Sequence, residues 1–376
     1  MAVIGTHLRV TALRLGFRTV FGLPRAVKRM LAGPQVRVEN QGLDLDVQLL
    51  YRIGSLLSRR EGGALDQATL AEQRRQADLS AHISADLVFD EIRTRDLEVD
   101  GATGPRPARL YEPEAAAAPG PLLVFFHGGG FALGSLTTAD PLCRLVAAQA
   151  QLRVLSVSYR LAPEHPYPAG LDDALAAFDW VRAHADRIGA DPHLVAVGGD
   201  SAGGNLALVT AHERPGDAAF VLALYPVTDV ERTGGSRQTF SSGYGLTADT
   251  VASLERFYLP EGVPDDDRRG AIVQADDLSA MPPVYLATAG FDPLRDEGEE
   301  LTERLRRAGV PVTGRRFPGL VHGYAGLTAI SAAARDATLD AASALRAGLA
   351  LAGRTPASST ALTPGTPHVG STGSAR

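Results

Sequence analysis

Five short apolar runs in the central and C-terminal parts of the chain predict buried strands. These runs are residues 121–126, 153–159, 194–199, 219–226 and 284–290. Each is shorter than a buried helix would be, which favours strands covered on both faces. Amphipathic helical patterns lie between them, for example in residues 170–189 and 294–309. This alternation predicts an α/β fold with a mostly parallel sheet and helices on both faces.

The two ends of the chain and one internal segment depart from this alternation. Residues 1–90 contain helical patterns and no convincing strand, so we expect a helical cap region there. Residues 91–353 are expected to form the α/β domain. Within it, residues 229–282 are an insertion after the C-terminal end of a strand, where parallel sheets bind ligands, and we expect a contribution to a cap or lid. Residues 354–376 are mostly Pro, Ser, Thr, Gly and Ala, which predicts a disordered tail.

The composition is ordinary for a soluble globular protein, with 45% hydrophobic and 21% charged residues. A formal net charge of -6 provides no cationic field, so we expect no nucleic-acid partner. The single cysteine, Cys143, excludes an internal disulfide, and we expect it to be a small buried hydrophobe. This cysteine content fits a reducing, cytoplasmic location. No apolar run reaches the ~20 residues that a membrane span needs.

The N-terminal segment is basic and amphipathic. One helical stripe carries Val10, Leu13, Phe17, Val20 and Phe21, and another carries Arg14, Arg18 and Arg25. The arginines make the segment a poor secretory signal. A segment of this kind either associates weakly with an anionic lipid surface or forms a cap helix that docks on the body of the protein. The second interpretation is the one we favour.

The pentapeptide Gly199-Asp200-Ser201-Ala202-Gly203 matches the pattern G-x-S-x-G between a predicted strand and a predicted helix. A serine at the apex of such a turn is strained, and its neighbours must be small because the backbone passes close to them. The turn exposes the hydroxyl and leaves the N–H of Ala202 free at a helix N-terminus. The alternative is an ordinary glycine-rich turn with a capping serine or aspartate.

A nucleophilic serine needs a base and an acid that orients the base. In this kind of fold they follow the serine in the order acid, then histidine, each in a loop after a strand. Asp292 follows the predicted strand at 284–290, and His322 lies in a loop after the last strand-like run. Asp296 is a weaker candidate for the acid because it lies one turn into the next helix.

A second glycine cluster, residues 127–131 (HGGGF), follows the first buried strand. Three successive glycines allow backbone N–H groups to face a substrate oxygen with no Cβ in the way. Binding of phosphate fits less well, because the spacing is not G-x-G-x-x-G and no G-K-[ST] follows. None of the nine histidines lies in a metal-binding pattern such as H-E-x-x-H, and we expect neither a metal nor a cofactor.

Taken together, the segments HGGGF, YRLAPEHPYPA, GGDSAGGN, DPLRDEG and HGY, in this order, resemble the hormone-sensitive lipase-like esterases. These are the bacterial family IV carboxylesterases of the α/β-hydrolase fold. The resemblance covers about residues 105–325. It implies an N-terminal helical cap and a small-molecule ester substrate of short to medium acyl chain. His127 and Glu164 lie within these segments, and we interpret them as residues that hold loops in place.

The resemblance also implies the site residues. The catalytic triad would be Ser201, Asp292 and His322, and the oxyanion hole would be the N–H groups of Gly128, Gly129 and Ala202. Three alternatives stay open: a lipase acting on longer-chain lipid esters, an amide or lactone hydrolase, and, more remotely, a non-catalytic ligand-binding protein on the same scaffold. The last loses weight because no member of the triad is missing.

Overall fold

The computed structural model describes residues 14–57, 64–84, 92–259 and 267–354. Its centre is an eight-stranded sheet in the order β10-β9-β8-β7-β5-β6-β4-β3. The strands are β3 (Arg93–Gly101), β4 (Gly104–Glu112), β5 (Gly120–Phe126), β6 (Arg153–Val157), β7 (Ala190–Asp200), β8 (Phe220–Leu224), β9 (Val284–Phe291) and β10 (Val312–Val321). Strand β4 is antiparallel to β3 and β6, and the other neighbours are parallel. The chain therefore has the α/β-hydrolase fold.

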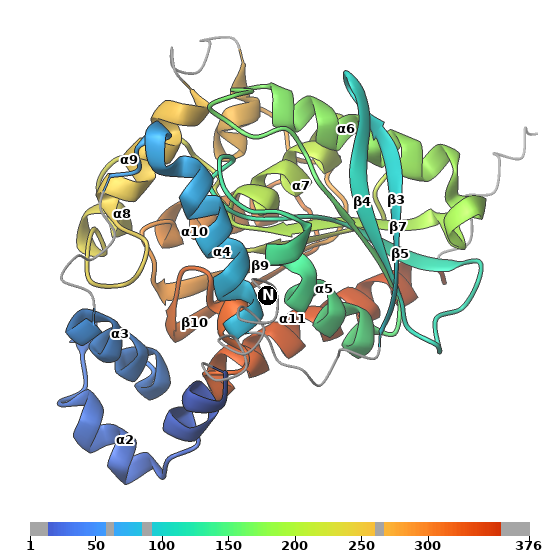
Figure 1. The fold of residues 1–376 in the computed structure, drawn as a ribbon. Coiled ribbons are helices and arrows are strands. Elements are labelled where there is room, and N and C mark those ends of the chain that lie inside the picture. The colour runs from blue at the N-terminus through green and yellow to red at the C-terminus, as the bar shows by residue number, and fades with distance from the viewer. Residues whose placement is uncertain (1–13, 58–63, 85–91, 260–266, 355–376) are drawn as a thin grey trace, which may run out of the picture.

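Helices cover both faces of the sheet (Figure 1). One face carries α5 (Leu136–Ala150) and α11 (Ala332–Ala352), and the other carries α6 (Ala169–Ala183), α7 (Ala202–Glu213) and α10 (Arg295–Arg307). Side chains alternate along the strands, so Leu122 and Val124 belong to the core under α6 and α7, whereas Leu123 and Phe125 belong to the core under α5. Both cores are apolar, which explains why the strands appear in the sequence as continuous apolar runs.

The five predicted strands correspond to β5, β6, β7, β8 and β9. The hairpin of β3 and β4 was not among the five runs, because β3 is an edge strand whose side chains are mostly exposed or half-buried. A strand ladder also occurs where none was expected: β1 (Arg37–Val38) pairs with β2 (Gln41–Gly42) across a turn. Residues 39 and 40 of that turn have φ of 50° and 64°, which lets two such short strands pair antiparallel.

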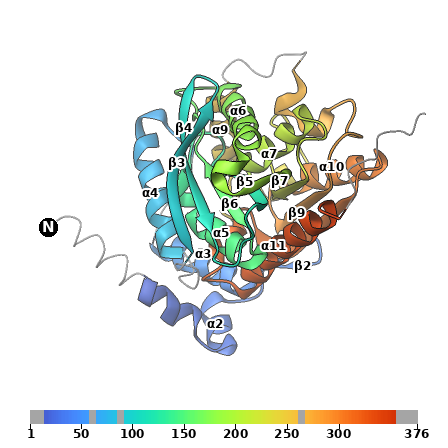
Figure 2. The same cartoon turned by 90° about the vertical axis from the view of Figure 1, so that its right-hand side faces the viewer.

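The N-terminal region otherwise contains helices: residues 14–21, α2 (Arg25–Ala32), α3 (Leu45–Leu57) and α4 (Leu70–Ser84). Helix α2 lies at the outer edge of the molecule in both ribbon views (Figures 1 and 2). Phe21 belongs to a small core with residues of α2 and α3 and with Ile330, and Phe17 and Val20 pack against this core. This part of the apolar stripe therefore faces protein, whereas Val10 and Leu13 lie outside the described residues.

The insertion after β8 packs against the N-terminal helices. It contains α8 (Ser236–Thr239) and α9 (Ala248–Tyr258). The Tyr51 hydroxyl of α3 donates to the carbonyl of Tyr244 at 3.1 Å, and the N–H of Leu65 donates to Ser253 Oγ of α9 at 3.0 Å. We call α3, α4, α8 and α9 the helical cover.

In the part of the chain that the structure describes, no helix combines the length and the apolar character needed to cross a bilayer. The predicted tail lies outside the described residues, except for Arg354.

Candidate active site

Ser201 occupies the tight turn between β7 and α7. Its φ of 53° and ψ of -118° lie in a region that residues with a side chain rarely adopt. Main-chain hydrogen bonds maintain this conformation: Ser201 N–H donates to the carbonyl of Leu224 at 2.9 Å, and the Ser201 carbonyl accepts from Asn205 N–H at 3.1 Å and Val227 N–H at 3.2 Å. The strain is thus held by the neighbouring strand and helix.

The glycines on either side of the serine are required by close backbone contacts. A Cβ on Gly203 would overlap the carbonyl oxygen of Phe126, and a Cβ on Gly199 would overlap the carbonyl group of Gly203. Strand β5 therefore passes so close to the start of α7 that no side chain fits between them. Only glycine at both positions allows the turn to present the Ser201 hydroxyl.

Three predicted residues that are far apart in the sequence are connected by hydrogen bonds. His322, directly after β10, places Nε2 2.9 Å from Ser201 Oγ and Nδ1 2.9 Å from Asp292 Oδ2. Asp292 directly follows β9 and is fully buried, and its Oδ1 accepts the N–H of Leu294 at 2.8 Å. The carboxylate is held in place on both oxygens, and Nδ1 must carry the proton if Nε2 is to accept one from the serine.

The environment of His322 favours its charged form. Burial lowers the pKa of His322, but the charge of Asp292 and the hydrogen bond to it raise the pKa more, so that the net pKa lies above the ordinary value. Among the described residues, the rival acid Asp296 has other partners: it accepts the N–H of Ser236 at 2.8 Å and pairs with Arg295 at 2.8 Å.

The first glycine of the HGGGF loop does not fit the expected role. Gly128 N–H donates to Asp200 Oδ1 at 2.8 Å, so it is already occupied. This contact speaks against Gly128 as an oxyanion donor and corrects that expectation, because a buried N–H bonded to a carboxylate is not available to a substrate. Sequence reasoning missed it because HGGGF does not show which of its glycines faces inwards.

The next two glycines line the cavity at Ser201. Gly129 and Gly130 have φ of 118° and 58°, and both contribute to the cavity wall. In the described residues, no group accepts a hydrogen bond from the N–H of Gly129, Gly130 or Ala202. These three amides are therefore available to an oxyanion beside Ser201 Oγ. We call them, with Ser201, His322 and Asp292, the candidate centre.

Asp200 connects the two glycine-rich turns. Burial raises the pKa of Asp200 to about 6, although the N–H of Gly128 lowers it. A Cβ on Gly128 would lie 2.5 Å from the other oxygen of this carboxylate. Asp200, the residue before Ser201, thus fixes the position of the loop that carries Gly129 and Gly130.

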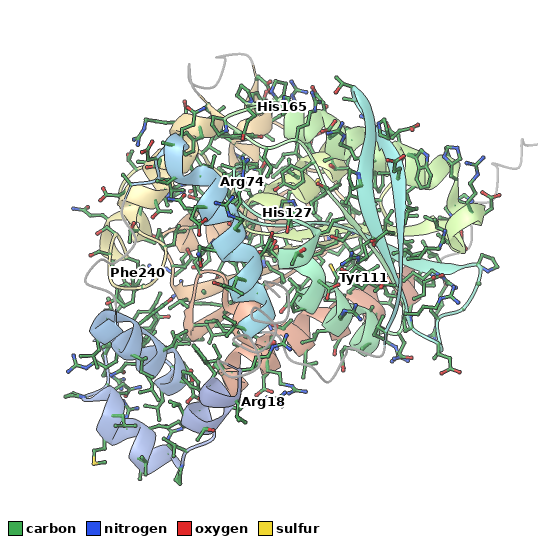
Figure 3. The ribbon with its side chains drawn as sticks, in the orientation of Figure 1. Arg18, Arg74, Tyr111, His127, His165 and Phe240 are labelled. Atoms are coloured by element: carbon green, nitrogen blue, oxygen red, sulfur yellow. The ribbon has the colours of Figure 1, made fainter. Side chains whose placement is uncertain are left out.

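His127 and Glu164, expected to hold loops in place, make contacts of that kind. The His127 ring stacks on Tyr159 at 4.4 Å and donates from Nδ1 to the carbonyl of Gly128 at 2.8 Å, and burial lowers the pKa of His127 to about 4. Glu164 accepts two hydrogen bonds from Arg74 of α4, at 2.7 and 2.8 Å. Arg74 also donates to the carbonyl of Ala132 at 2.8 Å. Arg74 and His127 are labelled in Figure 3.

A cavity of about 270 Å³ opens beside Ser201 and His322. Most of its wall is apolar and comes from both the α/β domain and the helical cover: Phe131, Leu133, Val227, Val230, Leu246, Val251, Leu254, Tyr258 and Leu294. A second cavity of about 290 Å³ adjoins the same glycine loop: Gly129 and Asp200 line both cavities, and residues of α4 and α5 line the second. Within the described residues, no group of three or more metal-ligating side chains could hold a metal ion.

Two charged residues of the cavity wall were not predicted from the sequence. They are Arg237 of α8 and Glu255 of α9, both in the insertion. The spacing of residues in this segment does not indicate them, because the insertion contains no known motif. A helix as short as α8 also shows no periodic pattern in the sequence. Only the fold places them in the same cavity as Ser201.

Comparison with protein-family models matches residues 123–326 to a family described as "alpha/beta hydrolase fold". The "Carboxylic ester hydrolase LipN" of Mycobacterium tuberculosis is 39% identical over 350 residues, which cover 90% of this chain and 92% of that protein. An "Ethyl acetate hydrolase" of Pseudomonas putida is 36% identical and covers 67% of this chain and 82% of its own length.

Solved structures of ester hydrolases are also similar to this chain. An ester hydrolase from the metagenome of Lake Arreo, in complex with a bipyridine phosphonate derivative, superimposes with a TM-score of 0.77 and 36% identity, covering 82% of this chain and 99% of that one. An esterase of Pyrobaculum calidifontis gives a TM-score of 0.72 and 34% identity, covering 78% of this chain and 97% of that one.

Proposed function

We propose that this chain, a carboxylic ester hydrolase that belongs to the hormone-sensitive lipase-like branch of the α/β-hydrolase family, hydrolyses short- to medium-chain esters. In this proposal Ser201 is the nucleophile, His322 is the base and Asp292 is the acid that orients the base. The observation that carries the proposal is the hydrogen-bonded chain from Ser201 Oγ through both nitrogens of His322 to Asp292, at 2.9 Å in each step. The Ser201 end of this hydrogen-bonded series lies at the wall of the cavity.

The mechanism follows from these positions. His322 Nε2 takes the proton as Ser201 Oγ attacks the acyl carbonyl, and Asp292 stabilises the imidazolium that forms. The oxyanion accepts hydrogen bonds from the N–H groups of Gly129, Gly130 and Ala202, and loss of one such donor costs about 3 kcal/mol in the transition state. His322 then protonates the leaving alcohol, and the same base activates the water that releases the acid.

The size and lining of the cavity support short to medium acyl chains. A volume of about 270 Å³ is slightly below the roughly 300–1,000 Å³ of typical ligand pockets, and a mostly apolar wall suits an alkyl chain. A lipase acting on long-chain lipid esters would need space outside this cavity. Amides and lactones remain alternative substrates, since the same groups perform any acyl transfer.

Hydrolysis of p-nitrophenyl esters from acetate to palmitate, by the wild type and Ser201→Ala, tests the proposal. We expect activity to be highest between butyrate and octanoate. The variant should lose it by on the order of 10⁴-fold or more, because the nucleophile is absent. Thermal unfolding at the wild-type temperature would show that Ser201→Ala is folded. Activity on the longest chains alone would favour a lipase, and a folded wild type inactive on esters, amides and lactones would favour a binding protein.

A further inference from the structure

Apart from Asp200 and the candidate centre, the mostly apolar wall of the cavity beside Ser201 has one charged region. Arg237 and Glu255 form it, from two helices of the insertion, and Arg237 Nη1 donates to Glu255 Oε1 at 2.6 Å. Neither residue contacts the candidate centre in the described structure, so the mechanism above does not use them. A charged pair in a cavity of this kind acts on what the cavity binds.

Most donors of Arg237 are occupied on the side away from the cavity. Its Nε and Nη2 donate to Glu297 Oε2 at 3.1 and 2.9 Å, and Nη2 also donates to the carbonyl of Asp229 at 2.8 Å. Glu297 is fully buried and accepts the N–H of Thr228 at 2.9 Å. Arg237 is only 9% exposed, and this network fixes its guanidinium group.

Glu255 is the carboxylate of this group that reaches the cavity. One guanidinium faces two carboxylates, Glu297 beneath it and Glu255 at the cavity. The side chain of Glu255 is 31% exposed, and its Oε2 accepts no hydrogen bond from another residue in the part of the chain that the structure describes. Burial raises the pKa of Glu255, as expected for a carboxylate with too few donors. An acceptor of this kind favours a ligand that brings a donor.

We propose that Glu255 is a specificity-determining residue that favours esters whose cavity-bound part carries a hydrogen-bond donor, a hydroxyl or a protonated amine, distant from the ester bond. The inference rests on the proposed function, because it concerns the cavity of the same serine. A carboxylate at that position of the substrate would be repelled by Glu255. An alkyl group would leave Glu255 Oε2 without a donor once water is displaced.

The test compares hexanoate, 6-hydroxyhexanoate and 6-aminohexanoate p-nitrophenyl esters, together with the corresponding acetates of hexanol, 1,6-hexanediol and 6-aminohexanol. Ratios of kcat/KM between the functionalised and the alkyl ester are measured for the wild type, Glu255→Gln and Glu255→Leu. A ratio within one variant cancels any general loss of activity. The matched control is Glu303→Gln, a glutamate outside the cavity that pairs with Arg306 of its own helix.

We expect the wild type to favour the hydroxyl or amine ester by about tenfold in one of the two series, the free energy of one hydrogen bond to a charged group. Glu255→Leu should abolish the preference, Glu255→Gln should retain part of it for the hydroxyl only, and Glu303→Gln should leave it unchanged. Equal ratios in the wild type and Glu255→Leu would overturn the inference, while good rates on the alkyl esters would still support the proposed function. A wild type that hydrolyses no ester would refute both.

Discussion

In the candidate centre, main-chain hydrogen bonds hold Ser201 in place, whereas contacts that involve side chains attach the helical cover to its surroundings. Ser201 is fixed by three main-chain hydrogen bonds, and Gly203 lies against the carbonyl of Phe126 with no room for a methyl group. The cover is attached by contacts such as Arg74 to Glu164 and Leu65 to Ser253.

The difference has a consequence for function. A centre built from backbone contacts tolerates almost no substitution, because each change moves several atoms of the reaction at once. A cover attached by side chains can change its cavity-facing residues while the centre stays intact. This is why we assign the chemistry to the centre and substrate selection to residues of the cover such as Glu255.

The largest effect within this comparison is expected from Asp292→Asn. The amide cannot stabilise the imidazolium, and the activity should fall by on the order of 10³- to 10⁴-fold. The pH profile should also move. Protonated His322 cannot accept the proton of Ser201, so activity is lost as the pH falls through the pKa of His322. Asp292 raises that pKa, and in the variant the loss should occur at a lower pH.

The profile is measured as kcat/KM against pH for both proteins. A variant whose acidic limb coincides with that of the wild type would show that Asp292 does not set the pKa of His322. A variant that retains more than a tenth of the activity would argue against Asp292 as the orienting acid.

Two Gly→Ala substitutions compare the regions directly. Gly203→Ala would force a methyl group into the Phe126 carbonyl, and we expect a loss of about 3 kcal/mol in unfolding free energy or more, together with loss of activity. Gly54→Ala is the matched change in helix α3 of the cover. No atom lies within 4 Å of its Cβ position, so the protein should gain about 0.5–1 kcal/mol from helix propensity. Chemical denaturation measures the change in unfolding free energy for both variants. Equal changes would contradict the expected difference between the candidate centre and the helical cover.

A smaller effect is expected where the cover meets the glycine loop. Arg74→Ala removes the ion pair with Glu164 and the hydrogen bonds to the carbonyls of Ala132 and Ala162. We expect a loss of about 1–3 kcal/mol in unfolding free energy and a higher KM. Arg75→Ala, whose partner is the exposed Glu72, should stay within about 0.5 kcal/mol of the wild type. Similar losses in both would mean that Arg74 does not anchor the cover.

The smallest effect concerns the lipid surface. Arg18 and Arg25 are exposed, but Phe17 and Phe21 of the same segment pack against protein. We therefore expect Arg18→Glu/Arg25→Glu to pellet with anionic vesicles as little as the wild type, in agreement with a docked cap segment. Pelleting of the wild type that disappears in the variant, at low ionic strength, would instead establish weak lipid association.

The sequence predicted the five inner strands β5 to β9 and the three side chains of the candidate centre because both depend on local patterns. Buried parallel strands appear as apolar runs, and the turn at Ser201 demands glycines at fixed offsets. Even there it left details open. The pattern HGGGF does not show that Gly128 N–H faces Asp200, because that pairing joins loops 72 residues apart.

What the sequence by itself determined is therefore the α/β fold and the order of the candidate residues Ser201, Asp292 and His322 along it, since each follows from spacing along the chain. Only the tertiary structure decided which amides are free for an oxyanion and which cover residues share a cavity with Ser201. Arg237, Glu255 and Glu297 come together from α8, α9 and α10. Their meeting depends on how the helices pack, and the packing of side chains from distant segments leaves no periodic trace in the sequence.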